Sequence, residues 1–406
     1  MGYTQQALRG FGWMGGFRVA SRGVAFVRTA ILARLLTPAQ FGVYGIGIIA
    51  LALLEMLTET GINVFLIQEK EDIHKYLGTA RTVSVFRGIL ISLLIFLSAP
   101  FIEKFFAMEG AKNILWLISL VPLIRGFINP SLIRFQKELS FRKEFFYRMS
   151  SFSLDSTVAV IVALSTKSTL SMVWGLLAGA VLEVIITNLF IKPTPSFEFH
   201  LPRFKEVTGR GKWVTLAGVF DYLSKQGDNL VVGKVLGAAP LGLYQNAYAL
   251  STLPVTEVSD VAGKVTFPVY SIIGGDVARA KKAYLKTLGV VSVLAIPIFL
   301  ILFFFPSLII NIALGEQWLG AVDTLRILAV FGLIKAISQT SSALFLGIRK
   351  QELVTLFTFV RFFVLAITIY PLTVSYGIVG AAYSAIASAL AVLPFMAYFL
   401  IKVLSK

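Results

Sequence analysis

Apolar runs of about twenty residues alternate with short polar segments along almost the whole chain. A helix rises about 1.5 Å per residue, so a run of this length crosses the roughly 30 Å hydrocarbon core of a bilayer. The pattern therefore predicts an all-α polytopic membrane protein with about twelve transmembrane helices. The predicted spans are residues 11–36, 41–66, 82–101, 113–133, 149–166, 171–191, 213–236, 241–270, 284–310, 320–347, 353–373 and 378–401.

Basic residues are concentrated in every second segment between these spans. If the N-terminus is cytoplasmic, the cytoplasmic segments hold 22 Lys and Arg residues and the opposite segments hold three. Because Lys and Arg favour cytoplasmic loops, this asymmetry predicts that both termini are cytoplasmic. The longest loop, about residues 192–212, is also predicted to be cytoplasmic, so we expect no large extramembrane domain.

The composition excludes most other classes of protein. Of the 406 residues, 57% are hydrophobic and 14% are charged, and the mean hydropathy is +0.82. Soluble proteins have about 25% charged residues, so a soluble enzyme, a disordered scaffold and a disulfide-linked secreted domain are excluded. The net charge of +16 follows the alternate loops, which predicts no nucleic-acid partner. The chain has no Cys, and His74 and His200 lie far apart in polar loops, so no metal site is predicted.

The first helix pair is repeated 200 residues later without gaps. Trp13 matches Trp213, and residues 34–44 match residues 234–244, with Tyr44 and Tyr244 among the identities. Each half contains six predicted helices, so both halves enter the membrane from the same side, as in transporters built from parallel repeats. We therefore expect an N-lobe at residues 1–192, a cytoplasmic linker at 193–212 and a C-lobe at 213–406. A pseudo-two-fold axis along the membrane normal would relate the two lobes.

Five segments of the chain carry a family resemblance. The stretch ILARLLTPAQFGVY at 31–44 resembles the signature of Wzx-type polysaccharide flippases, and DNLVVGKVLG at 228–237 with LGLYQNAY at 241–248 is similar. FPVYS at 267–271 and YGIVGAA at 376–382 also resemble this polysaccharide exporter branch of the multidrug/oligosaccharidyl-lipid/polysaccharide (MOP) superfamily. Members of the superfamily with this signature carry twelve to fourteen helices, and this chain is at the short end.

The resemblance implies a flippase of the inner (plasma) membrane that moves an isoprenoid-pyrophosphate-linked oligosaccharide from the cytoplasmic to the outer leaflet by alternating access. The implied partners are the lipid-linked oligosaccharide and membrane phospholipid, with glycosyltransferases and a polymerase of the same pathway as further candidates. The chain has no P-loop, so we expect transport to be driven by an ion gradient, with H⁺ or Na⁺ as candidate coupling ions, or by consumption of the substrate outside.

Three arginines inside the first span are the candidate substrate-binding residues. Counted from residue 11, Arg18 lies about 10 Å into the membrane, Arg22 about 16 Å and Arg28 about 25 Å, so Arg22 is near the midplane. A pyrophosphate crossing the membrane needs charge-assisted donors, and a guanidinium offers a rigid fork of them. The alternative is that these arginines pair with acidic residues and hold helices together.

The seventh span carries the equivalent stripe. Asp221, Lys225 and Asp228 lie at i, i+4 and i+7, so they share one face of a helix that must point to the protein interior. Lys225 is a further candidate for substrate binding, and the two aspartates are candidates for ion coupling or gating. The repeat makes Asp228 the counterpart of Arg28, which predicts a contact between them. Asp221 and Lys225 also form a plausible pair within one helix.

Other charged residues within spans have roles that the pattern leaves open. Four acids in the cytoplasmic halves of the second and eighth spans are candidates for gating or for carrying H⁺ or Na⁺, or they pair with Lys264 or the first helix; they are Glu55, Glu59, Glu257 and Asp260. We expect Arg87 to extend its side chain to the interface and Asp323 to pair with Arg326. Arg125, Lys335 and Arg361 lie deeper and are candidates to line a cavity, while Asp155 and Glu183 are not placed by the pattern.

Three other functions compete with the flippase. A cation-coupled drug or metabolite antiporter of the same superfamily predicts an apolar or acidic cavity, which the arginines of the first span disfavour. A membrane glycosyltransferase or polymerase needs long catalytic loops on the outer face, where the predicted loops are short and nearly uncharged. A scaffold without transport would not need charges inside the membrane.

Overall fold

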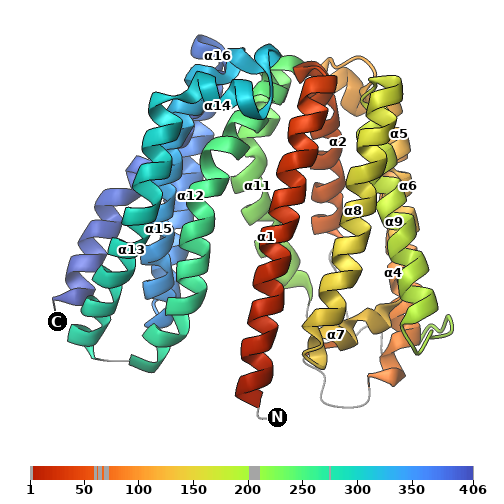
Figure 1. The fold of residues 1–406 in the computed structure, drawn as a ribbon, viewed down its shortest axis with the longest axis horizontal. Helices are drawn as coiled ribbons and strands as arrows, with labels where there is room; N and C mark the ends of the chain where they lie inside the picture. Colours follow the sequence, from red (N-terminus) through yellow and green to blue (C-terminus); the bar gives the residue numbers. More distant parts are fainter. Residues whose placement is uncertain are drawn as a thin grey trace. The chain divides into compact units, whose positions relative to one another are not determined.

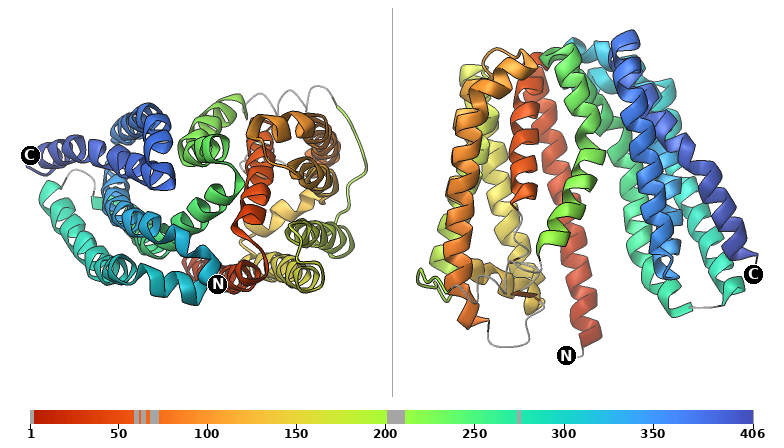
Figure 2. Two further views of the ribbon diagram at one scale, coloured as in Figure 1. Left: turned by 90° about the horizontal axis from the view of Figure 1, so that it is seen from above. Right: turned by 180° about the vertical axis from the view of Figure 1, so that it is seen from behind.

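The computed structural model describes residues 3–58, 62, 66–67, 73–200, 211–273 and 276–405. Within its helices, side chains are described except at residues 3–11, 14, 211–217 and 219–221. These described residues are almost entirely helical and include no β-strand. The chain divides into two compact units, Met1–Gln226 and Gly227–Lys406, and each is a bundle of helices (Figures 1 and 2).

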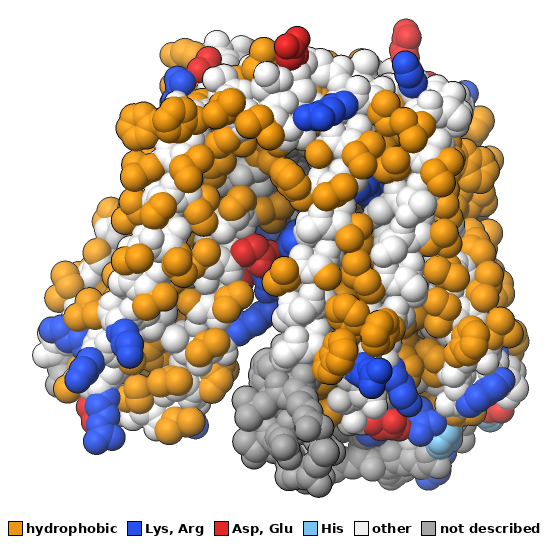
Figure 3. Space-filling model, viewed as in Figure 1, with side chains coloured by type: hydrophobic (Ala, Val, Ile, Leu, Met, Phe, Trp, Pro, Cys, Tyr) orange, Lys and Arg blue, Asp and Glu red, His pale blue; other side chains and the backbone are white. Residues whose placement is uncertain are grey.

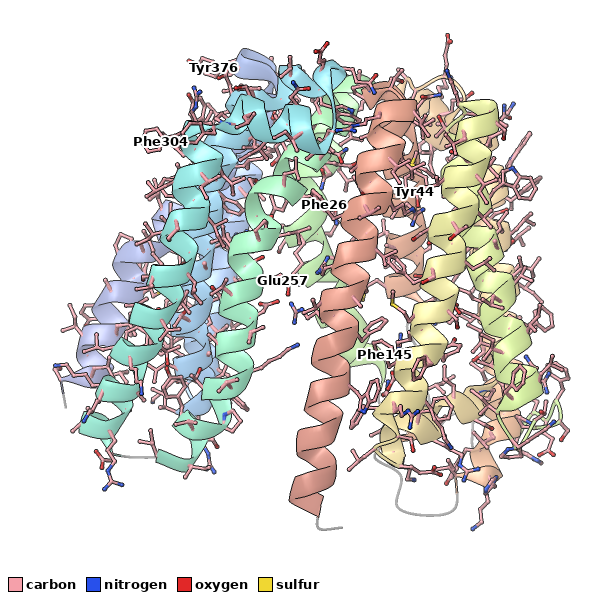
Figure 4. All side chains as sticks on the ribbon, viewed as in Figure 1. Phe26, Tyr44, Phe145, Glu257, Phe304 and Tyr376 are labelled. Carbon is pink, nitrogen blue, oxygen red and sulfur yellow. The ribbon has the colours of Figure 1, made fainter. Side chains whose placement is uncertain are left out.

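The first unit consists mainly of long helices that run side by side (Figure 1). Aromatic packing joins two of them, because Phe145 near the start of α8 lies with its ring centroid 5.4 Å from that of Trp13 on α1 (Figure 4). The helices are α1 (Tyr3–Leu35), α2 (Pro38–Leu57), α4 (His74–Phe106), α5 (Ala111–Ile118), α6 (Leu120–Arg125), η1 (Pro130–Ile133), α7 (Arg134–Lys137), α8 (Phe141–Thr166), α9 (Leu170–Phe190) and the first part of α11 (Gly211–Leu236).

The second unit is built from the end of α11 and the helices that follow it in the chain. Its core includes the buried Tyr270 of α12 and Tyr284 of α13, whose hydroxyl lies 2.9 Å from Ser341 Oγ of α15. The helices are α12 (Ala238–Ile273), α13 (Val277–Phe304), α14 (Pro306–Ala313), η2 (Glu316–Ala321), α15 (Val322–Gly347) and α16 (Gln351–Leu404).

The division between the units lies inside α11. The first part of this helix packs on α2, where the Tyr222 hydroxyl donates a 2.8 Å hydrogen bond to the Ile49 carbonyl. A Cβ on Gly218 would collide with the side chain of Met56. Residues 201–210 of the predicted linker lie outside the described residues. The predicted lobes, with boundaries at 192 and 213, and their pseudo-two-fold axis stay predictions.

Each of the twelve predicted spans overlaps a described helix, although α2 ends at Leu57 inside the second span and the ninth is divided at Phe305 between α13 and α14. Within the described part of the chain, six helices are long and apolar enough to cross a membrane, or seven if the bent pair Ala111–Arg125 and Pro130–Lys137 is one span. α1, α11, α12 and α15 are not among the six, and each carries several charged residues. α16 contains two of the predicted spans, 353–373 and 378–401. They meet at a kink at Gly377, whose φ of 62° and ψ of −142° are not helical.

The fourth predicted span, 113–133, is not one straight helix. α6 ends at Arg125, and the following segment turns by 72°. Asn129 is fully buried at this turn, and its amide nitrogen donates to the carbonyls of Thr187, Ile191 and Pro193 at 2.9–3.2 Å. The end of a helix leaves carbonyls without partners, and Asn129 satisfies those at the end of α9. The turn therefore places Asn129 where it can donate to these carbonyls, and hydropathy does not predict such a turn.

Helices α8 and α9 pack closely through small residues. A Cβ on Gly175 would lie 2.5 Å from the carbonyl oxygen of Asp155, and one on Gly179 would lie 3.1 Å from Asp155 Cβ. Glycines four residues apart let two membrane helices approach closely. The two glycines therefore make room for the Asp155 side chain between the helices.

The surface is apolar along the helices and basic toward one end. On the face that Figure 3 shows, hydrophobic side chains cover the flanks of both units, and Lys and Arg side chains gather toward one end of each. Large exposed apolar side chains include Phe101, Ile272 and Phe363. An exposed apolar surface of this kind is the expected surface of a protein whose solvent is lipid.

Candidate functional site

The first unit contains a charged cavity of about 610 Å³. Its wall is built from α2, α4, α6, η1, α7, α8, α9 and the first part of α11. Apolar side chains such as Ile91 and Met56 alternate in it with five charged ones, which are Glu55, Arg87, Arg125, Arg148 and Glu183. Three of these five charges are guanidinium groups.

A second cavity of about 360 Å³ adjoins the first. Its lining brings Arg22 of α1 together with Asp155 of α8. The two cavities share Arg125, Arg148 and Glu183, so these three side chains form a common wall. Of the three candidate arginines in the first span, Arg22 therefore lines a cavity. Arg125 of the fourth span, which was expected to line a cavity, is confirmed there.

Arg28 pairs with a carboxylate of its own unit. Its Nη1 lies 3.0 Å from Asp155 Oδ2, and the two side chains are only 13% and 10% exposed. The other carboxylate oxygen, Asp155 Oδ1, is buried and has no hydrogen-bond partner among the described residues. The predicted contact between Arg28 and Asp228 stays a prediction, while each of the two has a partner inside its own unit.

Arg125 lies between two carboxylates. Its Nε is 3.4 Å from Glu183 Oε2 of α9, and its Nη1 is 3.9 Å from Glu55 Oε1 of α2. Charge-assisted hydrogen bonds are usually 2.7–2.9 Å long, so both contacts are loose. Glu55, predicted as a gating or coupling residue, is therefore placed at the larger cavity beside a cation.

Arg148 belongs to a helix that begins earlier than predicted. The sequence places a span at 149–166 and leaves Arg148 in a loop, but α8 begins at Phe141. That prediction is wrong because Arg142, Lys143 and Glu144 interrupt the apolar run although they belong to the helix. Arg148 Nε lies 2.9 Å from the buried Glu144 Oε1, which also accepts a 2.9 Å hydrogen bond from Gln136.

The expectation that Arg87 extends to the interface is also wrong. Its Nε donates a 3.1 Å hydrogen bond to Thr58 Oγ1, and Nη2 donates to the carbonyl of Glu55. Both partners lie at the end of α2, where helical carbonyls have no partner within the helix. Arg87 also lines the larger cavity. Hydropathy alone does not show that the end of α2 offers acceptors to this side chain.

The structure places the remaining candidates as follows. Arg18 is half-buried on α1, Lys225 is exposed on α11, and Glu257 (Figure 4) and Asp260 are half-buried on α12. The side chain of Asp221 and the whole of Glu59 lie outside the described residues. The Asp323–Arg326 pair is confirmed at 3.6 Å between Oδ1 and Nη1, and both side chains are exposed.

The second unit holds its own buried polar cluster. Asp228 is buried, and its Oδ2 accepts a 2.9 Å hydrogen bond from the Tyr244 hydroxyl of α12. Lys335 Nζ of α15 lies 3.4 Å from the Tyr248 hydroxyl. The Arg361 guanidinium of α16 lies over the ring of Phe331, 5.2 Å from its centroid. The positive charges of Arg361 and Lys335 both act on the Asp228 carboxylate.

The predicted repeat would place the two clusters at equivalent positions with exchanged charge. Tyr44, the counterpart of Tyr244, lies on α2 (Figure 4) within electrostatic reach of Arg28 and Asp155. The repeat pairs Arg28 with Asp228, and a six-residue insertion that aligns Pro100 with Pro306 pairs Asp155 with Arg361. An arginine and an aspartate would thus change places between the first and fifth helices of the two repeats.

Asp155 and Glu183 are functional candidates that the sequence pattern did not place. Both are carboxylates inside apolar spans, and a charge there requires a partner. Their partners, Arg28 and Arg125, are equally conspicuous as charges inside spans. The pairing could not be derived because it depends on which helices are neighbours.

The described residues contain no group of three or more His, Asp and Glu side chains able to hold a metal ion. What the two cavities can do is bind an anion. Guanidinium groups donate in a fixed fork that matches phosphate oxygens, and four of them line the two cavities. Their neighbouring carboxylates keep the site close to charge balance when no anion is present.

The family match covers most of the chain. The profile of the family described as "Polysaccharide biosynthesis protein" matches residues 31–323. The lipopolysaccharide biosynthesis protein WzxC of Escherichia coli K12 is 24% identical over 87% of this chain and 72% of its own length. The teichuronic acid biosynthesis protein TuaB of Bacillus subtilis 168 is 22% identical over 86% of this chain and 73% of its own length.

Solved structures share the fold. The lipid II flippase MurJ in an inward closed conformation matches with a TM-score of 0.73 at 17% identity, over 96% of this chain and 89% of that one. An inward-facing multidrug resistance MATE family transporter of the MOP superfamily matches with a TM-score of 0.68 at 14% identity, over 94% and 95%. The predicted fold class, an all-α polytopic membrane protein, is confirmed.

Proposed function

Because the chain belongs to the polysaccharide biosynthesis protein family, we propose that it is a flippase for an isoprenoid-pyrophosphate-linked oligosaccharide. It is a Wzx-type member of the MOP superfamily and a multi-pass membrane protein. It moves its substrate from the cytoplasmic to the outer leaflet for the synthesis of a cell-surface polysaccharide. WzxC and TuaB are named as biosynthesis proteins for lipopolysaccharide and teichuronic acid, and the structural neighbour MurJ is named as a lipid II flippase, which supports a transporter rather than an enzyme.

The observation that carries the proposal is the set of guanidinium groups inside the first unit. Arg22, Arg87, Arg125 and Arg148 line the two cavities, between helices whose outer surfaces are apolar. A pyrophosphate cannot enter hydrocarbon without such donors, because the transfer of an unpaired charge from water to an apolar medium is strongly unfavourable. The oligosaccharide needs only a wet, polar path.

The same proposal assigns orientation and energetics. The alternation of basic loops supports cytoplasmic termini and a place in the inner membrane. Substrate binding by Arg18, Arg22, Arg28 and Lys225 remains part of the proposal. H⁺ or Na⁺ is the proposed coupling ion. Glycosyltransferases and a polymerase that make and consume the substrate are the proposed partners.

A cation-coupled drug antiporter is less consistent with the chain. Such a protein binds organic cations, which the four arginines that line the cavities would repel. The family match also lies with polysaccharide biosynthesis.

A reconstituted translocation assay tests the proposal. Proteoliposomes would carry a fluorescent polyprenyl-diphosphate disaccharide, and a membrane-impermeant quencher would report its movement between leaflets. Protein-dependent translocation of this lipid supports the flippase. Accumulation of a cationic dye on an imposed ion gradient, without lipid translocation, would support the antiporter instead.

A further inference from the structure

Arg125 is held by two carboxylates without an ideal bond to either. Its Nε is buried and has no hydrogen-bond partner of good geometry among the described residues, although Glu183 Oε2 lies 3.4 Å away. Glu55 is farther still, at 3.9 Å. A guanidinium has five N–H donors, so most of the donor capacity of Arg125 is not taken up by these contacts.

The neighbouring pairs are tighter. Arg28 and Asp155 are 3.0 Å apart and mostly buried, and Arg148 Nε lies 2.9 Å from the buried Glu144. Those carboxylates are committed to their partners. Glu183, by contrast, is 21% exposed and lies on the wall that both cavities share, as does the 37% exposed Arg125.

We propose that Arg125 binds the diphosphate group of the transported lipid by exchanging Glu183 for it, and that the released Glu183 takes up a proton from water. The inference rests on the proposed flippase function and names a binding residue and a coupling step within it. No bond between heavy atoms changes in the exchange, and the one bond formed is the carboxyl O–H of Glu183, with its proton supplied by the aqueous solution. One ion pair is replaced by another, and the carboxylate gains one proton.

The surroundings of Glu183 favour such an exchange. Once the diphosphate neutralises Arg125, a second negative charge close by is disfavoured, because like charges favour protonation of the carboxylate. The second cation on the shared wall, Arg148, keeps its terminal nitrogens available because its Nε holds Glu144. The charged or titratable side chains that line the two cavities around Glu183 are Arg22 of α1, Glu55 of α2, Arg87 of α4, Arg125 of α6, Tyr147, Arg148 and Asp155 of α8, and Tyr222 of α11.

The full-length protein in lipid nanodiscs would be titrated with farnesyl diphosphate and, separately, with inorganic pyrophosphate. Arg125→Gln is expected to weaken farnesyl diphosphate binding about tenfold or more, because it removes a charged donor. Glu183→Gln is expected to strengthen binding about threefold or more, because it removes the competitor. The double variant should bind as weakly as Arg125→Gln alone. Asp323→Asn, which removes the carboxylate of an exposed pair, is the matched control and should leave the affinity unchanged.

Proton uptake gives an independent readout. In the wild type, affinity should rise as the pH falls, and calorimetry in two buffers should detect proton uptake on binding. Glu183→Gln should lose that uptake. If the pair is only structural, Glu183→Gln will weaken binding or leave it unchanged, which overturns the inference. If the protein binds inorganic pyrophosphate and does not bind farnesyl diphosphate, the inference is also overturned, because the site then takes a free anion and not a lipid.

Failure of the inference is distinguishable from failure of the flippase function. If the wild type translocates the labelled lipid and Glu183→Gln alters neither its affinity nor its pH dependence, the exchange is wrong and the flippase stands. If the wild type translocates no lipid-linked sugar, the proposed function itself fails.

Discussion

Arg28 and Asp155, separated by 127 positions in sequence, form a mostly buried ion pair with 3.0 Å between Nη1 and Oδ2. The pair joins α1 to α8, and Asp155 is seated against Gly175 and Gly179 of α9. Three helices of the first unit therefore meet at one charge pair. The position of α1, which carries Arg22, depends on it.

Breaking this pair should destabilise the protein more than reversing it. Arg28→Asp or Asp155→Arg leaves an uncompensated buried charge, which costs about 3–5 kcal/mol. The double reversal should recover part of the loss, measured as the thermal unfolding midpoint in detergent. The pairing predicted from the repeat makes a different claim, that Arg28→Asp is rescued by Asp228→Arg. Rescue by Asp228→Arg and not by Asp155→Arg would contradict the structural pair.

Gly175 should tolerate no larger residue. In Gly175→Ala the new Cβ would meet the backbone oxygen of Asp155, and overpacking of this kind costs about 1–3 kcal/mol. Thermal unfolding again measures the effect. Gly289→Ala on α13 is the matched control, because its Cβ would meet nothing within 4 Å. Equal midpoints for the two variants would show that α8 and α9 are not packed as described.

Asn129 should be essential for the end of α9. Asn129→Ala leaves the carbonyls of Thr187 and Ile191 without this donor, while Pro193 keeps its hydrogen bond from Ser131 Oγ, and we expect a loss of about 2–3 kcal/mol of stability. Proteolysis between residues 188 and 200 should accelerate in parallel. Asn113→Ala, at an exposed position of α5, serves as the control. A variant at 129 as stable as this control would refute the capping role.

Tyr244 should matter through its hydroxyl. Tyr244→Phe leaves Asp228 Oδ2 buried without this donor, which costs about 1–3 kcal/mol. Tyr376→Phe removes the hydroxyl of an exposed tyrosine (Figure 4) and should have no effect. Unfolding midpoints of the two variants test the difference. If they do not differ, the Asp228–Tyr244 hydrogen bond contributes nothing measurable.

Hydropathy and loop charge predicted the helices well because both are local properties of the sequence. The break after Arg125 escaped this reasoning, since it depends on Asn129 reaching the end of α9. Arg148 escaped it because charged residues interrupt the apolar run in the first turns of α8, although these turns are helical.

The candidate site was predicted in part. The cost of charge in a membrane marked Arg22 and Arg125 as interior residues, and both line a cavity. The equivalence of Arg28 and Asp228 that the repeat predicts stays a prediction. Which carboxylate faces which arginine depends on the neighbours of each helix, and sequence spacing within one helix carries no such information. Asp155 and Glu183 therefore became interpretable only with α8 and α9 in place.

The central claim is that intramembrane arginines carry a lipid-linked diphosphate across the bilayer, and Arg22 tests it most directly. In proteoliposomes with the fluorescent polyprenyl-diphosphate disaccharide, Arg22→Ala should lower the translocation rate about tenfold or more at equal protein content, because the removed donor is charged. Arg22→Lys should restore only part of the rate, since an ammonium lacks the guanidinium fork. Arg326→Ala, at an exposed position, should translocate like the wild type. A wild-type rate for Arg22→Ala would contradict the account.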